Sequence, residues 1–185
     1  MIAGRFRSRR LKSVPGMTVR PTPDRLREAL FNVLAARFNG LAGHIEGCVF
    51  VDAFAGSGAV GIEALSRGAK HVILIERNPQ ALAIIAENLA SLGIRGEVTV
   101  ARGNVLTLVS KYAADVAFVD PPYEQESAYS ASLDALGGTC CRLAIAQHSS
   151  RLTLEPAYRE LTKTRVLRQG DNSLSFFERE ESGRG

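Results

Sequence analysis

The stretch VDPPYE, residues 119–124, follows the apolar run DVAFV and brings together groups that could act on an amine. Asp120 supplies a carboxylate, and the two prolines leave nearby carbonyls without competing N–H groups. A carboxylate and a carbonyl that accept from an exocyclic amine orient its nitrogen and favour the positive charge that grows during methyl transfer. If this amine belongs to a nucleobase, the aromatic ring of Tyr123 can stack on that base. The predicted catalytic residues are therefore Asp120, Pro121, Pro122 and Tyr123.

A glycine-rich segment, VDAFAGSGAVG, places Gly56, Gly58 and Gly61 in a G-x-G-x-x-G spacing. Glycines there let the chain turn sharply and let a ligand approach the backbone, and Glu76, twenty residues after Gly56, could hold two ribose hydroxyls. The spacing suits a nicotinamide dinucleotide and S-adenosylmethionine equally well, because both carry an adenosine.

Asp52, just before the glycines, favours S-adenosylmethionine. A carboxylate is a poor neighbour for a pyrophosphate and a good one for the ammonium group of a methionine moiety. The alternative is that Asp52 only caps the loop. Asn104 could accept from the adenine amino group while the Val105 backbone donates. The predicted cofactor-binding residues are Asp52, Ala53, Phe54, Gly56, Ser57, Gly58, Glu76, Arg77, Asn104 and Val105.

From residue 47 onward, short apolar runs rich in Val and Ile alternate with helical patterns. This is typical of a parallel sheet covered by helices on both faces. We expect an α/β, Rossmann-like, doubly wound and mostly parallel sheet of seven strands, with an antiparallel C-terminal edge hairpin turning at Gly170–Asp171. The Asp-Pro-Pro corner follows the fourth strand, so it should lie beside the glycine loop at the topological switch point.

The N-terminal segment does not show this alternation of strand and helix patterns. RPTPDRLREALFNVLAARF predicts an amphipathic helix with Thr22 as N-cap and Pro23 in the first turn. Before it, alternating residues and Pro15–Gly16 allow a β-hairpin. We therefore expect an N-terminal basic arm, hairpin and helix over residues 1–38 and a methyltransferase domain over residues 39–185.

The net charge is concentrated at the N-terminus. Residues 1–37 hold nine Lys and Arg against two acids, or +7, whereas the whole chain is +4, so the rest is −3. A basic end of this kind predicts a polyanionic partner, although a basic arm that only aids solubility is the alternative. The basic residues of this end are Arg5, Arg7, Arg9, Arg10, Lys12, Arg20, Arg25, Arg27 and Arg37.

Composition narrows the class of protein further. The chain of 185 residues is 45% hydrophobic and 23% charged, which is ordinary for a globular protein, and no apolar run is long enough to span a membrane. No apolar region follows the basic N-terminus, so no secretory signal is expected. The three cysteines lack CxxC spacing and the three histidines share no ligand spacing, so we expect reduced thiols, a cytoplasmic location and no metal.

With these motifs in place, the sequence resembles the RsmD family of bacterial 16S rRNA guanine-N2 methyltransferases. The resemblance rests on RPTPDRLREALFNVL, VDAFAGSGAVGIEALSRGA, IERNPQALAIIAENLASLG, FVDPPY and LSFFERE. It implies S-adenosylmethionine as cofactor, S-adenosylhomocysteine as product, and 16S rRNA within the small ribosomal subunit or its assembly intermediate as partner. We expect a monomer.

The resemblance also implies roles for individual residues. Asp120 and the Pro121 carbonyl would hold the guanine amino group, and Tyr123 would stack on the base. The loop Phe54–Gly58 would cradle the methionine moiety. Arg20 and Thr22 would border the site, and the arginines before Lys12 would grip RNA backbone. The RNA-binding residues that the resemblance implies are Arg5, Arg7, Arg9, Arg10, Lys12, Arg20, Thr22 and Arg25. Glu76 would bind the ribose, and Asn104, where many relatives have Asp, would bind the adenine. Relatives also often carry an acid where this chain reads AIAQHSS.

Three other functions remain open at this point. An adenine-N6 methyltransferase would use the same Asp-Pro-Pro-Tyr corner, but the chain has no evident room for a separate target-recognition domain. An NAD-dependent oxidoreductase would use the glycine spacing and Glu76, but no Tyr-x-x-x-Lys or His-acid arrangement is evident. A nucleic-acid-binding module without catalysis would not need Asp52 and Asp120.

Overall fold

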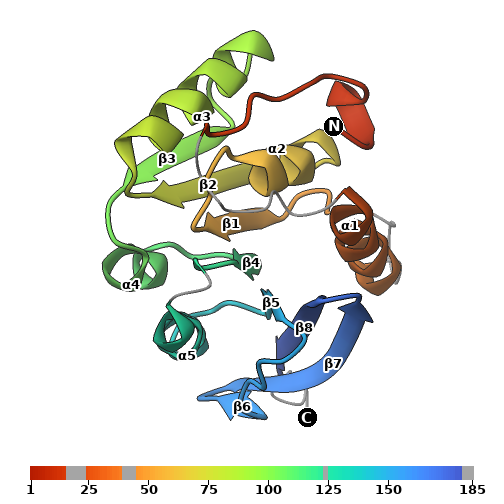
Figure 1. Ribbon diagram of the computed structural model, residues 1–185, viewed down its shortest axis with the longest axis vertical. Helices are drawn as coiled ribbons and strands as arrows, with labels where there is room; N and C mark the ends of the chain where they lie inside the picture. The colour runs from red at the N-terminus through yellow and green to blue at the C-terminus, as the bar shows by residue number, and fades with distance from the viewer. Residues whose placement is uncertain (16–23, 39–44, 123–124, 181–185) are drawn as a thin grey trace.

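The computed structural model describes residues 1–15, 24–38, 45–122 and 125–180, and it shows one central sheet with helices on both faces (Figure 1). Tyr123, Arg20 and Thr22 therefore lie outside the described residues. The helices are η1 Gly4–Phe6, α1 Asp24–Phe38, α2 Ala59–Ser66, α3 Pro79–Ser91, α4 Val105–Leu108, η2 Val109–Lys111 and α5 Glu126–Gly137. The strands are β1 Val49–Ala53, β2 His71–Glu76, β3 Val98–Arg102, β4 Val116–Val119, β5 Leu143–Ser149, β6 Ala157–Tyr158, β7 Leu161–Gln169 and β8 Asn172–Arg179.

The sheet has the strand order β3-β2-β1-β4-β5-β8-β7-β6. Strands β1 to β5 pair in parallel, and β8, β7 and β6 continue the sheet antiparallel. The order reverses between β1 and β4, which makes this the topological switch point. The Rossmann-like prediction is confirmed, and so is the C-terminal hairpin at Gly170–Asp171. The strand beyond the expected seven is β6, a two-residue strand that pairs with β7.

Alternate residues of the parallel strands pack into two separate cores. In β1, Phe50 belongs to the core beneath α1, α2 and α3, whereas Val51 belongs to the core beneath α4 and α5. In β4, Phe118 and Val119 divide in the same way. Both faces of these strands are therefore buried, which is why their sequences are continuously apolar.

The predicted N-terminal hairpin is wrong for the residues that the structure describes. Residues 1–15 contain the single 3-10 turn η1 and no strand. Four of their backbone N–H groups donate to side chains of α2 and α3: Ile2 and Ala3 donate to Glu63, Phe6 to Ser66, and Lys12 to Asn88. We call residues 1–15 the arm.

The predicted amphipathic helix is present as α1, Asp24–Phe38. Its apolar stripe, Leu26, Leu30, Val33 and Leu34, is buried in the same core as β1 and β2. Its predicted cap at Thr22 and Pro23 lies outside the described residues. Helix α1 thus packs on the sheet that carries the predicted site.

Candidate active site

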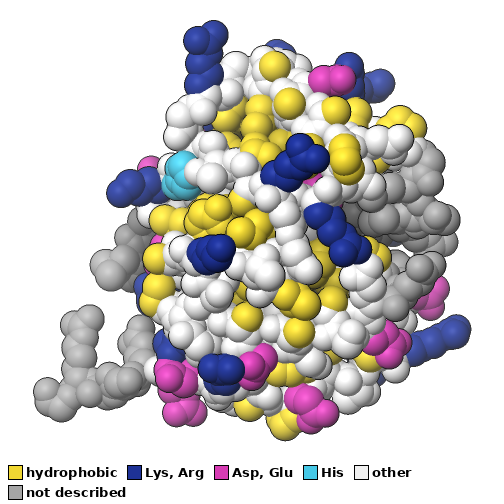
Figure 2. All heavy atoms as spheres, turned by 90° about the vertical axis from the view of Figure 1, so that its left-hand side faces the viewer, with side chains coloured by type: hydrophobic (Ala, Val, Ile, Leu, Met, Phe, Trp, Pro, Cys, Tyr) yellow, Lys and Arg dark blue, Asp and Glu magenta, His cyan; other side chains and the backbone are white. Residues whose placement is uncertain are grey.

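The ends of β1 and β4 bring the two acidic motifs together. The strands are paired in parallel, with Asp52 opposite Phe118 and Ala53 opposite Val119. Asp120 therefore leaves β4 next to the point where Phe54 and the glycine loop leave β1. This is the crevice in which doubly wound folds bind ligands. Figure 2 views the molecule from the side at which the arrows of β1, β2 and β3 end, and isolated basic side chains stand there among apolar ones.

Asp120 is held by a side chain from the neighbouring strand. Gln147, near the end of β5, donates from Nε2 to Asp120 Oδ2 over 3.0 Å. Burial raises the pKa of the Asp120 carboxyl to about 8, and the nearby charge of Asp52 adds to the rise. Gln147 Oε1 is buried and has no hydrogen-bond partner among the described residues. Rotated by half a turn, the same amide would accept from a protonated Asp120.

The corner after Asp120 keeps one carbonyl available. Pro121 is buried, and its carbonyl accepts no hydrogen bond from the described part of the chain. The Pro122 carbonyl accepts from Gln125 N over 2.8 Å, which fixes the turn into α5. Asp120 and the Pro121 carbonyl thus remain as two adjacent acceptors.

Asp52 is buried at the end of β1 and its Oδ2 accepts from Gly61 N over 2.9 Å. Burial raises the pKa of its carboxyl to about 7; the Gly61 hydrogen bond opposes this, and the charge of Glu76 adds to it. One oxygen thus caps the start of α2, as the alternative interpretation required, and the other remains for a ligand. A cationic ligand group would stabilise the ionised form.

The glycine loop has the conformation that its sequence predicts. Gly56 and Gly58 have φ of +55° and +78°, and Phe54 also has a left-handed φ of +67°, a strained conformation for a side-chain-bearing residue. A Cβ on Gly56 would meet no atom within 4 Å, whereas one on Gly61 would lie 2.4 Å from Leu74 Cδ2. Gly56 therefore leaves space for a ligand, and Gly61 lets α2 pack closely on β2.

Glu76 and Asn104 already hold backbone groups. Glu76 Oε2 accepts from Gly56 N over 2.8 Å, and Oε1 accepts from Arg77 N and Asn78 N over 2.7 and 2.8 Å. Asn104 Oδ1 caps α4 by accepting from Leu106 N over 3.0 Å. A carboxylate oxygen has more than one acceptor position, so Glu76 can still bind hydroxyls.

These groups surround one cavity of about 470 Å³. This volume lies within the range of small-molecule sites. The described lining residues include three carboxyl groups, those of Asp52, Glu76 and Asp120, and one cationic side chain, that of Arg77. The predicted residues that line it are Asp52, Phe54, Gly56, Ser57, Glu76, Arg77, Asn104, Val105, Asp120 and Pro122. Ala53, Gly58 and Pro121 are not among the residues that line it.

The carboxyl groups of this cavity fit S-adenosylmethionine better than a nicotinamide dinucleotide. A pyrophosphate would stand among carboxylates, whereas the ammonium and sulfonium of S-adenosylmethionine would be attracted to them. Asp52, which has one carboxylate oxygen not used by Gly61, and Gly56, over which there is open space, both line this cavity. The residues present therefore fit S-adenosylmethionine.

Some contributors to this site are absent from the residues predicted from the sequence, and three of them bear on its function. Ser13 and Val14 of the arm line the cavity, and Gln147 holds Asp120. A polar residue directly after the apolar run LAIA, at the same sheet edge as the acidic motifs, was the available signal for Gln147. Nothing in the local sequence indicated where the arm would lie.

The predicted RNA-binding side chains differ in their partners. Arg5 pairs with Glu97 over 2.8 Å, Lys12 pairs with Glu87 over 2.7 Å, and Arg9 Nη2 donates to Ser91 O over 2.9 Å. Arg7, Arg10 and Arg25 are exposed, and no other described residue pairs with the side chain of Arg7 or Arg10. Arg7 and Arg10 are thus the arm's cations most available to an anion.

Metal sites and membrane spans are both absent from the described ranges. These ranges contain no group of three or more His, Cys, Asp or Glu side chains that could hold a metal ion. His71 and His148 are bound to Thr99 and Ser175, while His44 lies outside these ranges. Within the same residues, no helix is long and apolar enough to cross a membrane.

Residues 1–178 match a family model described as conserved hypothetical protein 95. Ribosomal RNA small subunit methyltransferase D of Escherichia coli is 37% identical over 127 residues, which span 68% of this chain and 60% of that protein. The chain belongs to the RsmD family.

Other relatives of this RsmD-family chain agree in sequence and fold. YlbH of Bacillus subtilis is 35% identical over 131 residues, covering 68% of this chain and 67% of that protein. The solved structure of yhhF from Escherichia coli has a TM-score of 0.81 and 29% identity, and the match covers 97% of both chains. The fold is therefore that of the Rossmann-like methyltransferases.

Proposed function

We propose that this protein transfers a methyl group from S-adenosylmethionine to the exocyclic N2 of a guanine in 16S rRNA of the small ribosomal subunit. The observation that carries the proposal is the position of Asp120 and the Pro121 carbonyl. Asp120 lines a cavity that carries three carboxyl groups and begins at the glycine loop, and the Pro121 carbonyl is the acceptor next to it in the chain. The substrate class rests on the family, whose Escherichia coli member is named as a small-subunit rRNA methyltransferase.

In this proposal each side of the cavity has a separate task. Asp52 holds the ammonium of S-adenosylmethionine, Glu76 holds the ribose hydroxyls, and the segment from Asn104 to Val105 borders the adenine. When bound, this cofactor supplies an electrophilic methyl group on a sulfonium and leaves as S-adenosylhomocysteine. The backbone of the glycine loop approaches the methionine moiety without side chains in the way.

Asp120 and the Pro121 carbonyl act on the base. Gln147 fixes one carboxylate oxygen of Asp120, which leaves the other to accept from the amine. Both acceptors direct the amine nitrogen at the methyl carbon and stabilise the positive charge that grows as the N–C bond forms and the C–S bond breaks. The amine then loses a proton, and a carboxylate with a raised pKa is suited to receive it. Tyr123 is predicted to stack on the base.

The arm extends the proposed contact to RNA backbone. Arg7 and Arg10 are exposed without a described partner, so they can bind phosphates without first breaking an ion pair. Arg5 and Lys12 must exchange Glu97 and Glu87 for phosphate. We therefore expect Arg7 and Arg10 to contribute more RNA affinity than Arg5 and Lys12.

Two measurements test this function. First, S-adenosylhomocysteine and NAD are titrated separately into the protein; binding of the first and not the second is expected, and the reverse would overturn the cofactor assignment. Second, Asp120→Ala should abolish methyl transfer and leave S-adenosylhomocysteine affinity within about threefold of wild type, because Asp120 is assigned to the base. Unchanged turnover in Asp120→Ala would contradict the assignment.

A further inference from the structure

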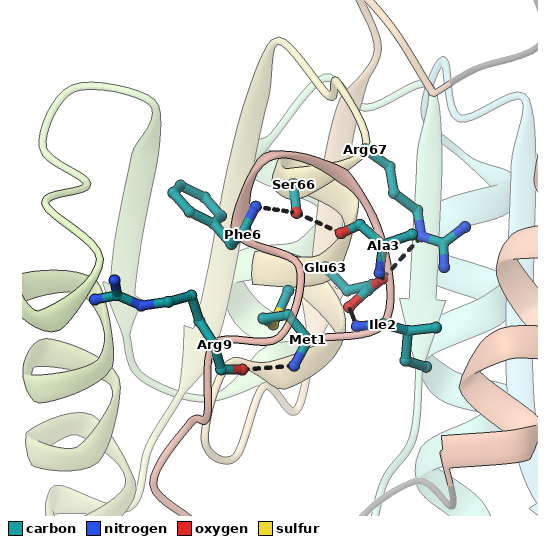
Figure 3. Close-up of polar contacts among 8 residues, drawn as sticks. All are labelled: Met1, Ile2, Ala3, Phe6, Arg9, Glu63, Ser66 and Arg67. Atoms are coloured by element: carbon teal, nitrogen blue, oxygen red, sulfur yellow. Dashed lines mark hydrogen bonds and ion pairs between the residues drawn. The ribbon is translucent and has the colours of Figure 1, made fainter.

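The arm is attached to the helices through its backbone. Glu63 of α2 is fully buried and accepts from both Ile2 N and Ala3 N over 2.9 Å. Ser66 Oγ accepts from Phe6 N over 2.9 Å and donates to Ala3 O over 2.7 Å. Figure 3 shows the arm folded over these side chains. Because these are main-chain contacts, the arm can be docked while the side chains of Arg7 and Arg10 stay available to a partner.

One buried side chain connects the arm to the glycine loop. Asn88 of α3 is 1% exposed, accepts from Lys12 N over 2.8 Å and donates from Nδ2 to Lys12 O over 3.0 Å. The same Nδ2 donates to Ser57 O over 3.0 Å. The three hydrogen bonds of the Asn88 side-chain amide thus go to the arm and to the glycine loop.

The residues that follow this contact form part of the cavity. Ser13 and Val14 come directly after Lys12, and both line the cavity together with Gly56 and Ser57. If the arm left, Asn88 would lose two of its three hydrogen bonds, and its amide would no longer be fixed against Ser57 from the arm side. The same movement would remove one wall of the cavity. The docked arm and the shape of the glycine loop therefore favour each other.

We infer that Asn88 is a positioning residue that couples docking of the arm to binding of the cofactor. This inference rests on the proposed function, because it takes the cavity as the cofactor site and the arm as an RNA contact. Cofactor in the cavity favours the docked arm, and the docked arm presents Arg7 and Arg10 in a fixed arrangement. By thermodynamic reciprocity, RNA that binds the docked arm raises cofactor affinity by the same factor.

The coupling is measured at the Lys12 amide, which donates to Asn88. Hydrogen exchange of this amide is followed with and without saturating S-adenosylhomocysteine, and the affinity for S-adenosylhomocysteine is measured separately by calorimetry. In the wild-type protein we expect the ligand to slow exchange at Lys12 by about fivefold or more. In Asn88→Ala we expect no slowing and an affinity at least about fivefold weaker.

Glu87→Gln is the matched control. It removes the Lys12 ion pair at the neighbouring position and leaves the Asn88 contacts in place, so ligand affinity and slowing should match the wild type. Asn88→Asp provides a second variant in case Asn88→Ala does not fold. It can still accept from Lys12 N but cannot donate to Ser57 O, so the slowing should again disappear.

The outcomes separate the two proposals. If the wild-type protein binds no S-adenosylhomocysteine, the proposed function fails and the coupling fails with it. If it binds the ligand and exchange at Lys12 does not change, the coupling alone is overturned. Slowing that persists unchanged in Asn88→Ala or Asn88→Asp would also overturn the role of Asn88.

Discussion

The pH dependence of methyl transfer follows from two neighbouring carboxyl groups. The pKa of Asp52 is raised to about 7 and that of Asp120 to about 8, chiefly by burial. Asp52 must be ionised to hold an ammonium, and Asp120 must be ionised to accept from the amine. At pH 7 a group with a pKa of about 8 is only about one-tenth ionised, and at pH 9 about nine-tenths. Activity should therefore rise with pH.

The expected profile has two steps because both ionisations are required. We expect kcat/KM for S-adenosylmethionine to rise about a hundredfold per pH unit below pH 7, about tenfold between pH 7 and 8, and to level above pH 8. Transfer of labelled methyl between pH 6 and 9, with S-adenosylmethionine and RNA both well below their KM values, measures it. This kinetic constant reports groups of the enzyme before the cofactor binds, so the cofactor's own positive charge does not displace the steps.

Two variants complete this test. Asp120→Asn cannot ionise at that position, so its low residual activity should show only the Asp52 step. Asp134→Asn changes an exposed carboxyl that pairs with Arg159, and its profile should match the wild type. A wild-type profile that is flat between pH 6 and 9 would refute the reasoning. So would an Asp120→Asn profile with the same two steps as the wild type.

Three further predictions concern stability and RNA binding. The pKa of Asp120 is higher in the folded state than in the unfolded state, so the folded protein keeps a proton that the unfolded chain releases. The free energy of unfolding, measured by urea titration, should therefore fall as pH rises from 5 to 9. The free energy of unfolding of Asp120→Asn should depend less on pH. Gly61→Ala should lower the free energy of unfolding by about 1–3 kcal/mol, because the added Cβ would lie 2.4 Å from a side-chain atom of β2. In the control Gly96→Ala the added Cβ meets nothing within 4 Å, so the free energy of unfolding should change by less than about 0.5 kcal/mol. Equal effects of the two substitutions in urea titration would contradict this prediction. Replacing Arg7 and Arg10 together with Ala should reduce the slope of log affinity against log salt by roughly 0.7–0.9 for each phosphate that the variant no longer binds, and an unchanged slope would show that neither side chain touches RNA.

The sheet and the acidic rim of the site could be predicted from the sequence because both follow from short-range patterns. Continuous apolar runs such as HVILIE report burial on both faces of a strand. In a doubly wound sheet, the carboxyl ends of neighbouring parallel strands then bring Asp52 and Asp120 together without any knowledge of side-chain contacts. The positive φ of Gly56 and Gly58 likewise follows from the residue type.

The arm could not be predicted in this way, because its partners on the rest of the fold lie 60 to 92 residues away in the chain. The arm side chains that pack against the core, Met1, Phe6 and Leu11, are five residues apart, so the alternation in the sequence did not report their burial. A signal was nevertheless present on the helices. Asn88 follows Ala81 and Ile85 on the buried stripe of α3, and Glu63 lies in the apolar helix AVGIEALS. Polar residues at buried helical positions predict a partner, but not which one.

The most direct test of the central claim is transfer of labelled methyl from S-adenosylmethionine to small ribosomal subunits from a strain that lacks this gene, followed by nucleoside analysis. The account predicts label in N2-methylguanosine, and the label should be lost with Asp120→Ala. Label in methyladenosine would preserve the reaction and contradict the guanine assignment. The absence of label from both subunits and free 16S rRNA would contradict the proposed function itself.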